Sequence, residues 1–207
     1  MPSPERWKAT WQELGVPITP ALLGAYEDLI ARYSEPHRKY HTVRHLGDCF
    51  AKLDEIRTIA ERPAEVEVAL WFHDAIYERS TENEAKSADL AAKVVRNAGK
   101  PPGSIKRISD LIMATRHDAA PEGNDARVLV DVDLSILGES PERFDEYERQ
   151  VREEYSWVPE VLFKRERKKI LEEFLARSAI FNTEQFRDRY ESPARANLER
   201  SLHKLRG

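Results

Sequence analysis

The sequence predicts an all-α fold, a single-domain bundle of many helices, and three observations support this prediction. Strand signals are scarce, because the chain has no clean alternation of β-branched residues and no Asn-Gly turn. A capping hydroxyl directly before a proline, which is typical of a helix start, recurs along the chain. These starts are SPE at 3–5, TP at 19–20, SPE at 140–142 and SPA at 192–194. Loop-forming residues gather in short segments, namely ERP at 61–63, GKPPG at 99–103 and APEGND at 120–125.

Each helix is placed by a start signal or by the stretch between two loops. ERP separates the third helix from the fourth, GKPPG the fifth from the sixth, and APEGND the sixth from the seventh. The expected helices span residues 4–14, 20–33, 39–58, 64–77, 82–98, 104–117, 125–137, 141–156, 159–180 and 193–205. Because no repeat or linker interrupts them, we expect one domain over 1–207. Its core motifs lie in 40–137, and the C-terminal helices of 141–205 pack on them.

The composition is that of a globular protein, with 41% hydrophobic and 34% charged residues among 207. No apolar run approaches the roughly 20 residues of a membrane span, and the N-terminal segment lacks the apolar core of a signal peptide. A net charge of −4 argues against binding to a nucleic-acid polymer. Cys49 is the only cysteine, so we expect no internal disulfide and a cytoplasmic location.

The segment ALWFHDAIYE at 69–78 places His73 and Asp74 inside an apolar, aromatic-rich run. On a helix, their neighbours three and four positions away are mostly apolar, so both side chains are expected inside the protein. Burying two such groups costs several kcal/mol unless each finds a partner.

The segment LVDVDLSILG at 129–138 repeats this anomaly. Asp131 and Asp133 point about 200° apart on a helix, so only one of them can face the core. Asp133 has apolar neighbours throughout, whereas Asp131 lies beside Arg127, which predicts that Asp133 is the buried one. Two carboxylates and an imidazole in a low-dielectric interior need a cation, and a divalent metal ion satisfies all three.

Further histidines come from YHTVRHLGDCF at 40–50, where His41 and His45 share a helical face. His45 lies at the edge of an apolar stripe and is the preferred ligand, while His41 lies on a wetter edge. Three roles stay open for His41: it contacts a residue that binds the metal, it binds a second metal ion, or it is an ordinary surface residue. His117, in RHDAAPEG at 116–123, ends a helix and is an accessory ligand, a phosphate contact or simply a favourable partner of the helix dipole.

This order of residues resembles the HD superfamily of predicted metal-dependent phosphohydrolases. The similar segments are YHTVRHL, WFHDAIYE, NEAKSA at 83–88, VDVDLSILG, REEY at 152–155 and ARANLE at 194–199. They cover residues 40–199 and match one uncharacterised branch, whose substrate is not agreed. The resemblance implies an HD-domain helical bundle with a metal ion bound by His45, His73, Asp74 and Asp133. The family's last aspartate usually precedes a residue and then a leucine, whereas Leu134 follows Asp133 directly, so Asp131 remains an alternative.

Such a site implies hydrolysis of a phosphomonoester or phosphodiester. A divalent ion lowers the pKa of a bound water from 15.7 towards about 7, and the ligands suit Mn, Fe, Ni, Mg, Co or Zn. We expect Asp74 also to orient the attacking water. The expected substrate is a phosphorylated small molecule or a nucleotide. The sequence does not determine the oligomeric state and is compatible with a homodimer. The candidate phosphate contacts are Arg44, Lys86, Arg116 and His117.

Glu84 has two interpretations. In TENE at 81–84 it completes a capping box with Thr81, or it is a general acid that protonates the leaving group. Two other functions also remain open for the whole chain. One is a regulatory module that binds metal or nucleotide without turnover. The other is a di-iron HD-type oxygenase, which needs His41 and His117 as additional ligands.

Overall fold

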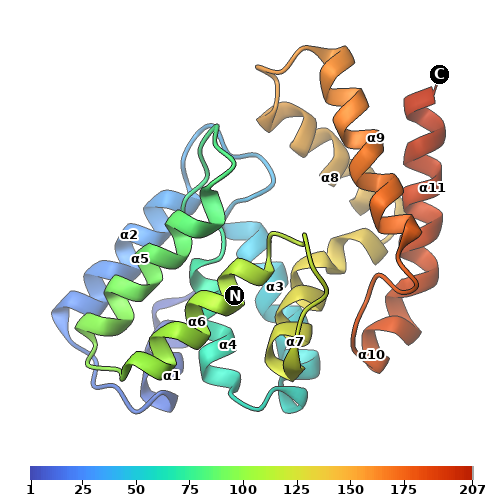
Figure 1. Cartoon of the computed structure of the whole chain (residues 1–207). Helices are drawn as coiled ribbons and strands as arrows, with labels where there is room; N and C mark the ends of the chain where they lie inside the picture. Colours follow the sequence, from blue (N-terminus) through green and yellow to red (C-terminus); the bar gives the residue numbers. More distant parts are fainter. Residues whose placement is uncertain (207) are drawn as a thin grey trace. The chain divides into compact units, whose positions relative to one another are not determined.

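The computed structural model describes residues 1–206, and its regular elements there are all helical, with no strand, which confirms the all-α prediction (Figure 1). The chain divides into two compact units, Met1–Val132 and Asp133–Gly207. The expectation of a single domain stays a prediction. No helix in the described part combines the length and the apolar character that crossing a membrane requires.

The first unit holds the helices that carry most of the candidate site residues. They are α1 (Pro4–Glu13), α2 (Pro20–Tyr33), α3 (Val43–Ile56), the 3-10 turn η1 (Arg57–Ile59), α4 (Pro63–Phe72), α5 (Asn83–Asn97) and α6 (Pro102–Ala114). Helix α7 (Gly123–Leu134) runs on to the boundary between the units. The second unit holds η2 (Ser135–Gly138), α8 (Pro141–Glu154), α9 (Glu160–Ala176), α10 (Glu184–Phe186), the π-helical turn η3 (Arg187–Glu191) and α11 (Ser192–Arg206).

Three of the four predicted helix caps are present. The hydroxyls of Ser3, Thr19 and Ser140 each accept a hydrogen bond from a backbone N–H in the first turn, with proline at the first helical position. The fourth prediction is wrong, because Ser192 has helical dihedral angles (φ −65°, ψ −47°) and continues the chain from the preceding turn into α11. A helix already in progress has no open N–H groups to cap there.

Helix α4 is the central element of the first unit, and it packs against α1, α3, α5 and α6 (Figure 1). All of its residues from Ala64 to Phe72 are buried, including two carboxylates. Glu65 accepts two hydrogen bonds from Arg107 at 2.6 and 2.7 Å, and Glu67 accepts one from Arg6 at 2.8 Å. Each buried charge thus has a cationic partner, which is the condition for keeping it inside.

The aromatic core of the same unit surrounds α4. Trp7, Trp11 and Trp71 are fully buried, and the ring of Trp7 meets that of Trp71 edge-on at 5.2 Å. The indole N–H of Trp7 donates to the carbonyl of Leu22 at 2.9 Å. The first helix is therefore held in place by the packing of the Trp7 ring and by the hydrogen bond of its indole N–H.

The second unit is built around α11, which packs against α9 and against η2 (Figure 1). The side-chain amide of Asn197 donates to the carbonyls of Leu137 and Glu139, each at 2.9 Å. It thereby satisfies two backbone acceptors in the segment that follows α7.

Three helix ends lie four or more residues from their predicted positions. Helix α3 begins at Val43 instead of 39, because the hydroxyl of Thr42 caps it by accepting from the N–H of Arg44. Helix α4 ends at Phe72 instead of 77, and α9 ends at Ala176 instead of 180. The early end of α4 puts His73 and Asp74 in a turn.

Candidate metal centre

The turn after α4 presents His73 and Asp74. The ring Nδ1 of His73 lies 2.8 Å from the carbonyl of Leu70, so Nδ1 carries the proton and donates. In the neutral ring the lone pair is then on Nε2, the atom that a metal ion needs. The N–H of Asp74 donates to the hydroxyl of Tyr33 at 3.3 Å, and this hydroxyl lies 3.3 Å from the carbonyl of Trp71. The predicted burial is confirmed for His73, while Asp74 is half-buried.

Helix α3 brings the second imidazole to this turn. The Nε2 atoms of His45 and His73 are 3.2 Å apart. The Oδ2 atom of Asp74 lies 3.0 Å from Nε2 of His73 and 3.4 Å from Nε2 of His45. Three potential ligand atoms from two segments therefore form a triangle with nearly equal sides. We call these three side chains the ligand triangle.

The sides of the ligand triangle fit the spacing of donor atoms around a divalent ion. Metal–ligand bonds of about 2.0–2.2 Å separate neighbouring donors by about 2.8–3.1 Å in an octahedron and about 3.3–3.6 Å in a tetrahedron. The observed distances of 3.0, 3.2 and 3.4 Å span these ranges. Imidazole nitrogen and carboxylate oxygen are donors for Mn, Fe, Co, Ni and Zn, so the residues present fit the expected group.

Cys49 is a further potential ligand that the sequence interpretation treated only as a small buried residue. Its sulfur lies 3.7 Å from Nδ1 and 3.6 Å from Nε2 of His45, one helical turn earlier on α3. Ligand atoms of His45, Cys49 and His73 all lie within 4.8 Å of one another, and all three residues are buried. The signal in the sequence was the four-residue spacing, which puts His45 and Cys49 on the same helical face.

The carboxylate of Asp74 is held in its charged form. Burial by itself raises the pKa of Asp74, since it disfavours the anion. The nearby imidazoles of His73, His41 and His45 act in the opposite direction, outweigh burial and keep this pKa well below its usual range. Asp74 is thus an anion at neutral pH, which is the state that binds a cation.

The two aspartates of α7 do not have the predicted burial. Asp131 is fully buried, and Asp133, the next-to-last residue of the helix, is half-buried, so the prediction that Asp133 is the buried one is wrong. Residues 128–132 are all buried, which means that this part of α7 is enclosed on every side. When every face of a helix segment is buried, the polarity of neighbouring residues on that helix does not indicate which side chain is buried.

His41 does not share a helical face with His45, contrary to prediction, because it precedes the first residue of α3. Its ring stacks on that of Tyr77, with the centroids 4.3 Å apart, and meets the ring of His45 edge-on at 5.8 Å. It therefore lies next to the ligand triangle in the loop that leads into α3.

The candidate phosphate contacts come from separate segments of the first unit. Lys86 forms an exposed ion pair with Glu78 at 2.7 Å, and Arg116 lies 3.4 Å from the exposed Asp118. Arg44 is exposed at the start of α3 and lines a cavity of about 480 Å³. His117 follows α6 with a positive φ of 57°, a left-handed conformation that suits a helix end.

Glu84 is not part of a capping box, so that structural interpretation is wrong. Glu82 is the N-cap of α5 and no side chain caps the helix, while Glu84 is the second helical residue. The side chain of Asn83 instead bonds the backbone of Glu78. Glu84 shares a helical face with Ser87, whose hydroxyl accepts from the N–H of Ile76, two residues after Asp74. The carboxylate of Glu84 is half-buried on the side of α5 that meets this segment.

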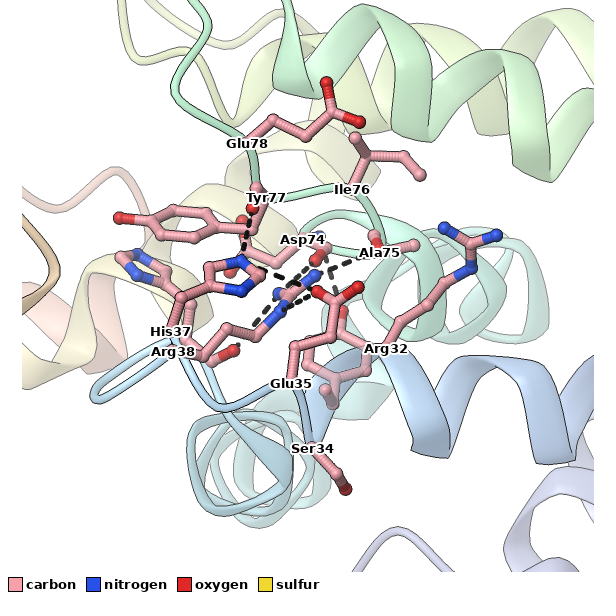
Figure 2. Close-up of polar contacts among 12 residues, drawn as sticks. Arg32, Ser34, Glu35, His37, Arg38, Asp74, Ala75, Ile76, Tyr77 and Glu78 are labelled. Atoms are coloured by element: carbon pink, nitrogen blue, oxygen red, sulfur yellow. Dashed lines mark hydrogen bonds and ion pairs between the residues drawn. The ribbon is translucent and has the colours of Figure 1, made fainter.

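Arg38 and Tyr33 are contacts of the site that the sequence interpretation missed. Figure 2 shows the guanidinium of Arg38 reaching the backbone of the turn after α4. Arg38 lies in the loop before α3, where an arginine between His37 and Lys39 has no distinctive pattern. Only the folded arrangement shows that it is buried.

Comparisons of the chain with protein-family models, with curated proteins and with solved structures find no match. The resemblance to the HD superfamily therefore stays a prediction from the sequence, and the chemistry of the site is argued from its own side chains.

Proposed function

We propose that this chain is a metal-dependent phosphohydrolase of the HD type, acting on a phosphorylated small molecule or nucleotide. The observation that carries the proposal is the ligand triangle, in which two imidazole nitrogens and a carboxylate oxygen lie 3.0–3.4 Å apart. Three donors at such distances fit the coordination of one shared cation, and imidazole nitrogen and carboxylate oxygen are both ligands of divalent metals.

The proposed ligands are His45, His73, Asp74 and Asp133. Within the first unit, His45, Cys49 and His73 each offer one atom for a metal ion, and Asp133 is proposed from the sequence. A second carboxylate suits a divalent ion, since with Asp74 it balances both positive charges. Asp133 is the next-to-last residue of α7, which ends at Leu134, whereas the sequence predicted a helix that continues to residue 137.

A divalent ion in this site supplies Lewis acidity and makes hydroxide available at neutral pH. Asp74 has the role of a permanent anion that holds and orients the nucleophilic water. Glu84 has a half-buried carboxylate, and among the described residues no hydrogen bond or ion pair holds it. We assign it the role of general acid, which gives its proton to the departing alcohol oxygen. The candidate phosphate contacts remain Arg44, Lys86, Arg116 and His117, of which Lys86 and Arg116 form ion pairs with Glu78 and Asp118.

The test is metal analysis of the purified protein, followed by phosphomonoesters and phosphodiesters assayed with Mn, Co, Ni, Mg and Zn. Asp74→Asn is expected to abolish metal occupancy and phosphate release. Asp54→Asn is the matched control, because Asp54 pairs with Arg6 at the surface and lies outside the ligand triangle. Phosphate release by Asp74→Asn at the wild-type rate contradicts the proposal. Tight nucleotide binding without phosphate release by the wild type supports the regulatory module instead.

A further inference from the structure

The loop between α2 and α3 contains a buried arginine. The residue Arg38 is only 3% exposed to solvent, although it lies in a loop. Its guanidinium donates to Glu35 at 3.0 Å through Nε and to the carbonyl of His41 at 3.2 Å through Nη1. The same group donates to the carbonyl of Asp74 at 2.7 Å and, through Nη2, to that of Ala75 at 3.1 Å (Figure 2).

These bonds join two segments that are far apart in the sequence. One is the loop that leads to α3 and His45, and the other is the turn that carries His73 and Asp74. Because α4 ends at Phe72, the carbonyls of this turn have no helical partner, and Ala75 is fully buried. The guanidinium satisfies two of these acceptors at once through two nitrogen atoms held in a fixed planar geometry, which the single nitrogen of an ammonium group lacks.

The surroundings of Arg38 fix its orientation. The guanidinium carbon lies 5.2 Å from the ring centre of Tyr33 and 5.4 Å from that of Tyr77. The ion pair with Glu35 balances its charge. A cation packed near two aromatic rings and bound to four acceptors has little freedom to rotate, so the backbone that it contacts is held as well.

We propose that Arg38 is a positioning residue of the metal centre, which sets the direction of the Asp74 side chain by holding the backbone carbonyl of the same residue. This inference rests on the proposed function, since it assigns Arg38 a role in that site. The distances from Asp74 Oδ2 to the two imidazoles, 3.0 and 3.4 Å, depend on the orientation of this turn. Without the guanidinium, two buried carbonyls lose their donor and the turn moves to regain partners.

The test compares Arg38→Met and Arg38→Lys with the wild type, using cobalt(II) as the probe. The d–d absorption spectrum reports the ligand geometry, and titration gives the affinity. Both variants are expected to bind cobalt(II) about tenfold or more weakly with an altered spectrum, which is the range seen when contacts behind a metal ligand are removed. Lysine keeps the charge and loses the fork, so wild-type affinity and spectrum in Arg38→Lys overturn the proposal.

Arg6→Met is the matched control. Arg6 is also an arginine with two carboxylate partners, Asp54 and Glu67, and it packs over a ring of the same unit without contacting the turn. The substitution Arg6→Met is expected to lower the stability of the protein and to leave the cobalt(II) spectrum unchanged. If Arg6→Met changes the spectrum as much as Arg38→Met does, the effect is general destabilisation and the proposal is overturned.

A second measurement on the metal-free protein separates this inference from the proposed function. The N–H of Ala75 bonds to the carbonyl of Phe72 at 2.9 Å inside the turn. Its hydrogen exchange is expected to be faster in both Arg38 variants and unchanged in Arg6→Met. If the wild type binds no cobalt(II), the proposal of a metal centre is contradicted. The exchange data then still decide whether Arg38 holds the turn. Unchanged exchange in the Arg38 variants overturns its positioning role.

Discussion

His45 and His73, 28 residues apart in the sequence, bring their Nε2 atoms to 3.2 Å from each other in the interior of the first unit. Since Nδ1 of His73 donates to a carbonyl, its Nε2 is an acceptor. The contact is favourable in the metal-free protein only if Nε2 of His45 carries a proton. A metal ion would replace this proton and bind both nitrogens, so the proton and the metal ion compete for the same pair of nitrogen atoms.

The first prediction concerns thermal stability. Binding of an ion at about 100 times its Kd stabilises the folded state by about 2.7 kcal/mol. For a chain of this size we expect Tm to rise by about 5–10 °C on addition of manganese, cobalt or zinc, and to fall again with a chelator. Differential scanning calorimetry measures both changes.

His73→Ala is expected to abolish the metal-induced rise in Tm. His37→Ala is the control, since His37 is an exposed histidine that bonds the carbonyl of Tyr77 at 2.8 Å and is not part of the ligand triangle. An equal rise in both variants would place the ion elsewhere.

The second prediction concerns Glu84. Because no hydrogen bond or cap depends on its side chain, Glu84→Gln is expected to change the free energy of unfolding by less than about 0.5 kcal/mol. The amide cannot donate an acidic proton to the leaving group, so kcat is expected to fall by about 10²–10⁴-fold. Steady-state kinetics and urea unfolding measure the two effects.

Glu82→Gln serves as the control for the Glu84 variant, because Glu82 is exposed at the start of the same helix. A large loss of stability in Glu84→Gln with full activity would make Glu84 a structural residue.

The sequence predicted the helical fold because its caps act locally. A hydroxyl before a proline determines a helix start within one turn, and Ser3, Thr19 and Ser140 show this. The end of α4 depends instead on Tyr33 and Arg38, which bond the turn from another part of the chain. No periodicity within the segment reports such partners, so the helix was predicted five residues too long.

The candidate site shows the same limit. The burial of His73 followed from its apolar surroundings, which are a property of the local segment. The burial of Asp131 did not, because α7 is enclosed and the elements around it decide exposure. Cys49 and Arg38 were missed because their proximity to the ligands arises only when α3 and the loop before it meet the turn.

The third prediction uses two glycines with opposite surroundings. A Cβ atom on Gly138 would lie 2.6 Å from Cβ and 2.8 Å from the carbonyl oxygen of Tyr190, within the second unit. Gly138→Ala is expected to cost about 1–3 kcal/mol, since backbone has to move. Gly24, in the interior of α2, has open space around the same position. Gly24→Ala is expected to stabilise by about 0.5–1 kcal/mol through helix propensity.

Chemical denaturation of both glycine variants measures these changes. Equal stability of Gly138→Ala and the wild type would show that η2 and η3 are not packed as closely as described.

The fourth prediction concerns alkaline pH and Tyr33. Burial raises the pKa of its hydroxyl from 10.0 to about 12. The nearby carboxylate of Asp74 acts in the same direction, while His73 and the guanidinium of Arg38 oppose the rise. In the unfolded chain the phenol ionises near pH 10, while in the folded protein it stays neutral up to about 12. The neutral hydroxyl therefore contributes stability that is fully present below pH 10 and is lost as pH rises from 10 to 12.

This shift of about two pKa units corresponds to about 2.7 kcal/mol. Tyr33→Phe cannot ionise, so its stability is expected to fall less steeply over this range, after an initial loss of the two hydrogen bonds at the hydroxyl. Tyr147 and the lysines titrate in both proteins and cancel in the difference. Urea unfolding at pH 9, 10 and 11 gives the two slopes. Parallel slopes would mean that Tyr33 ionises in the folded protein as readily as in the unfolded chain, and that water reaches the turn beside Asp74.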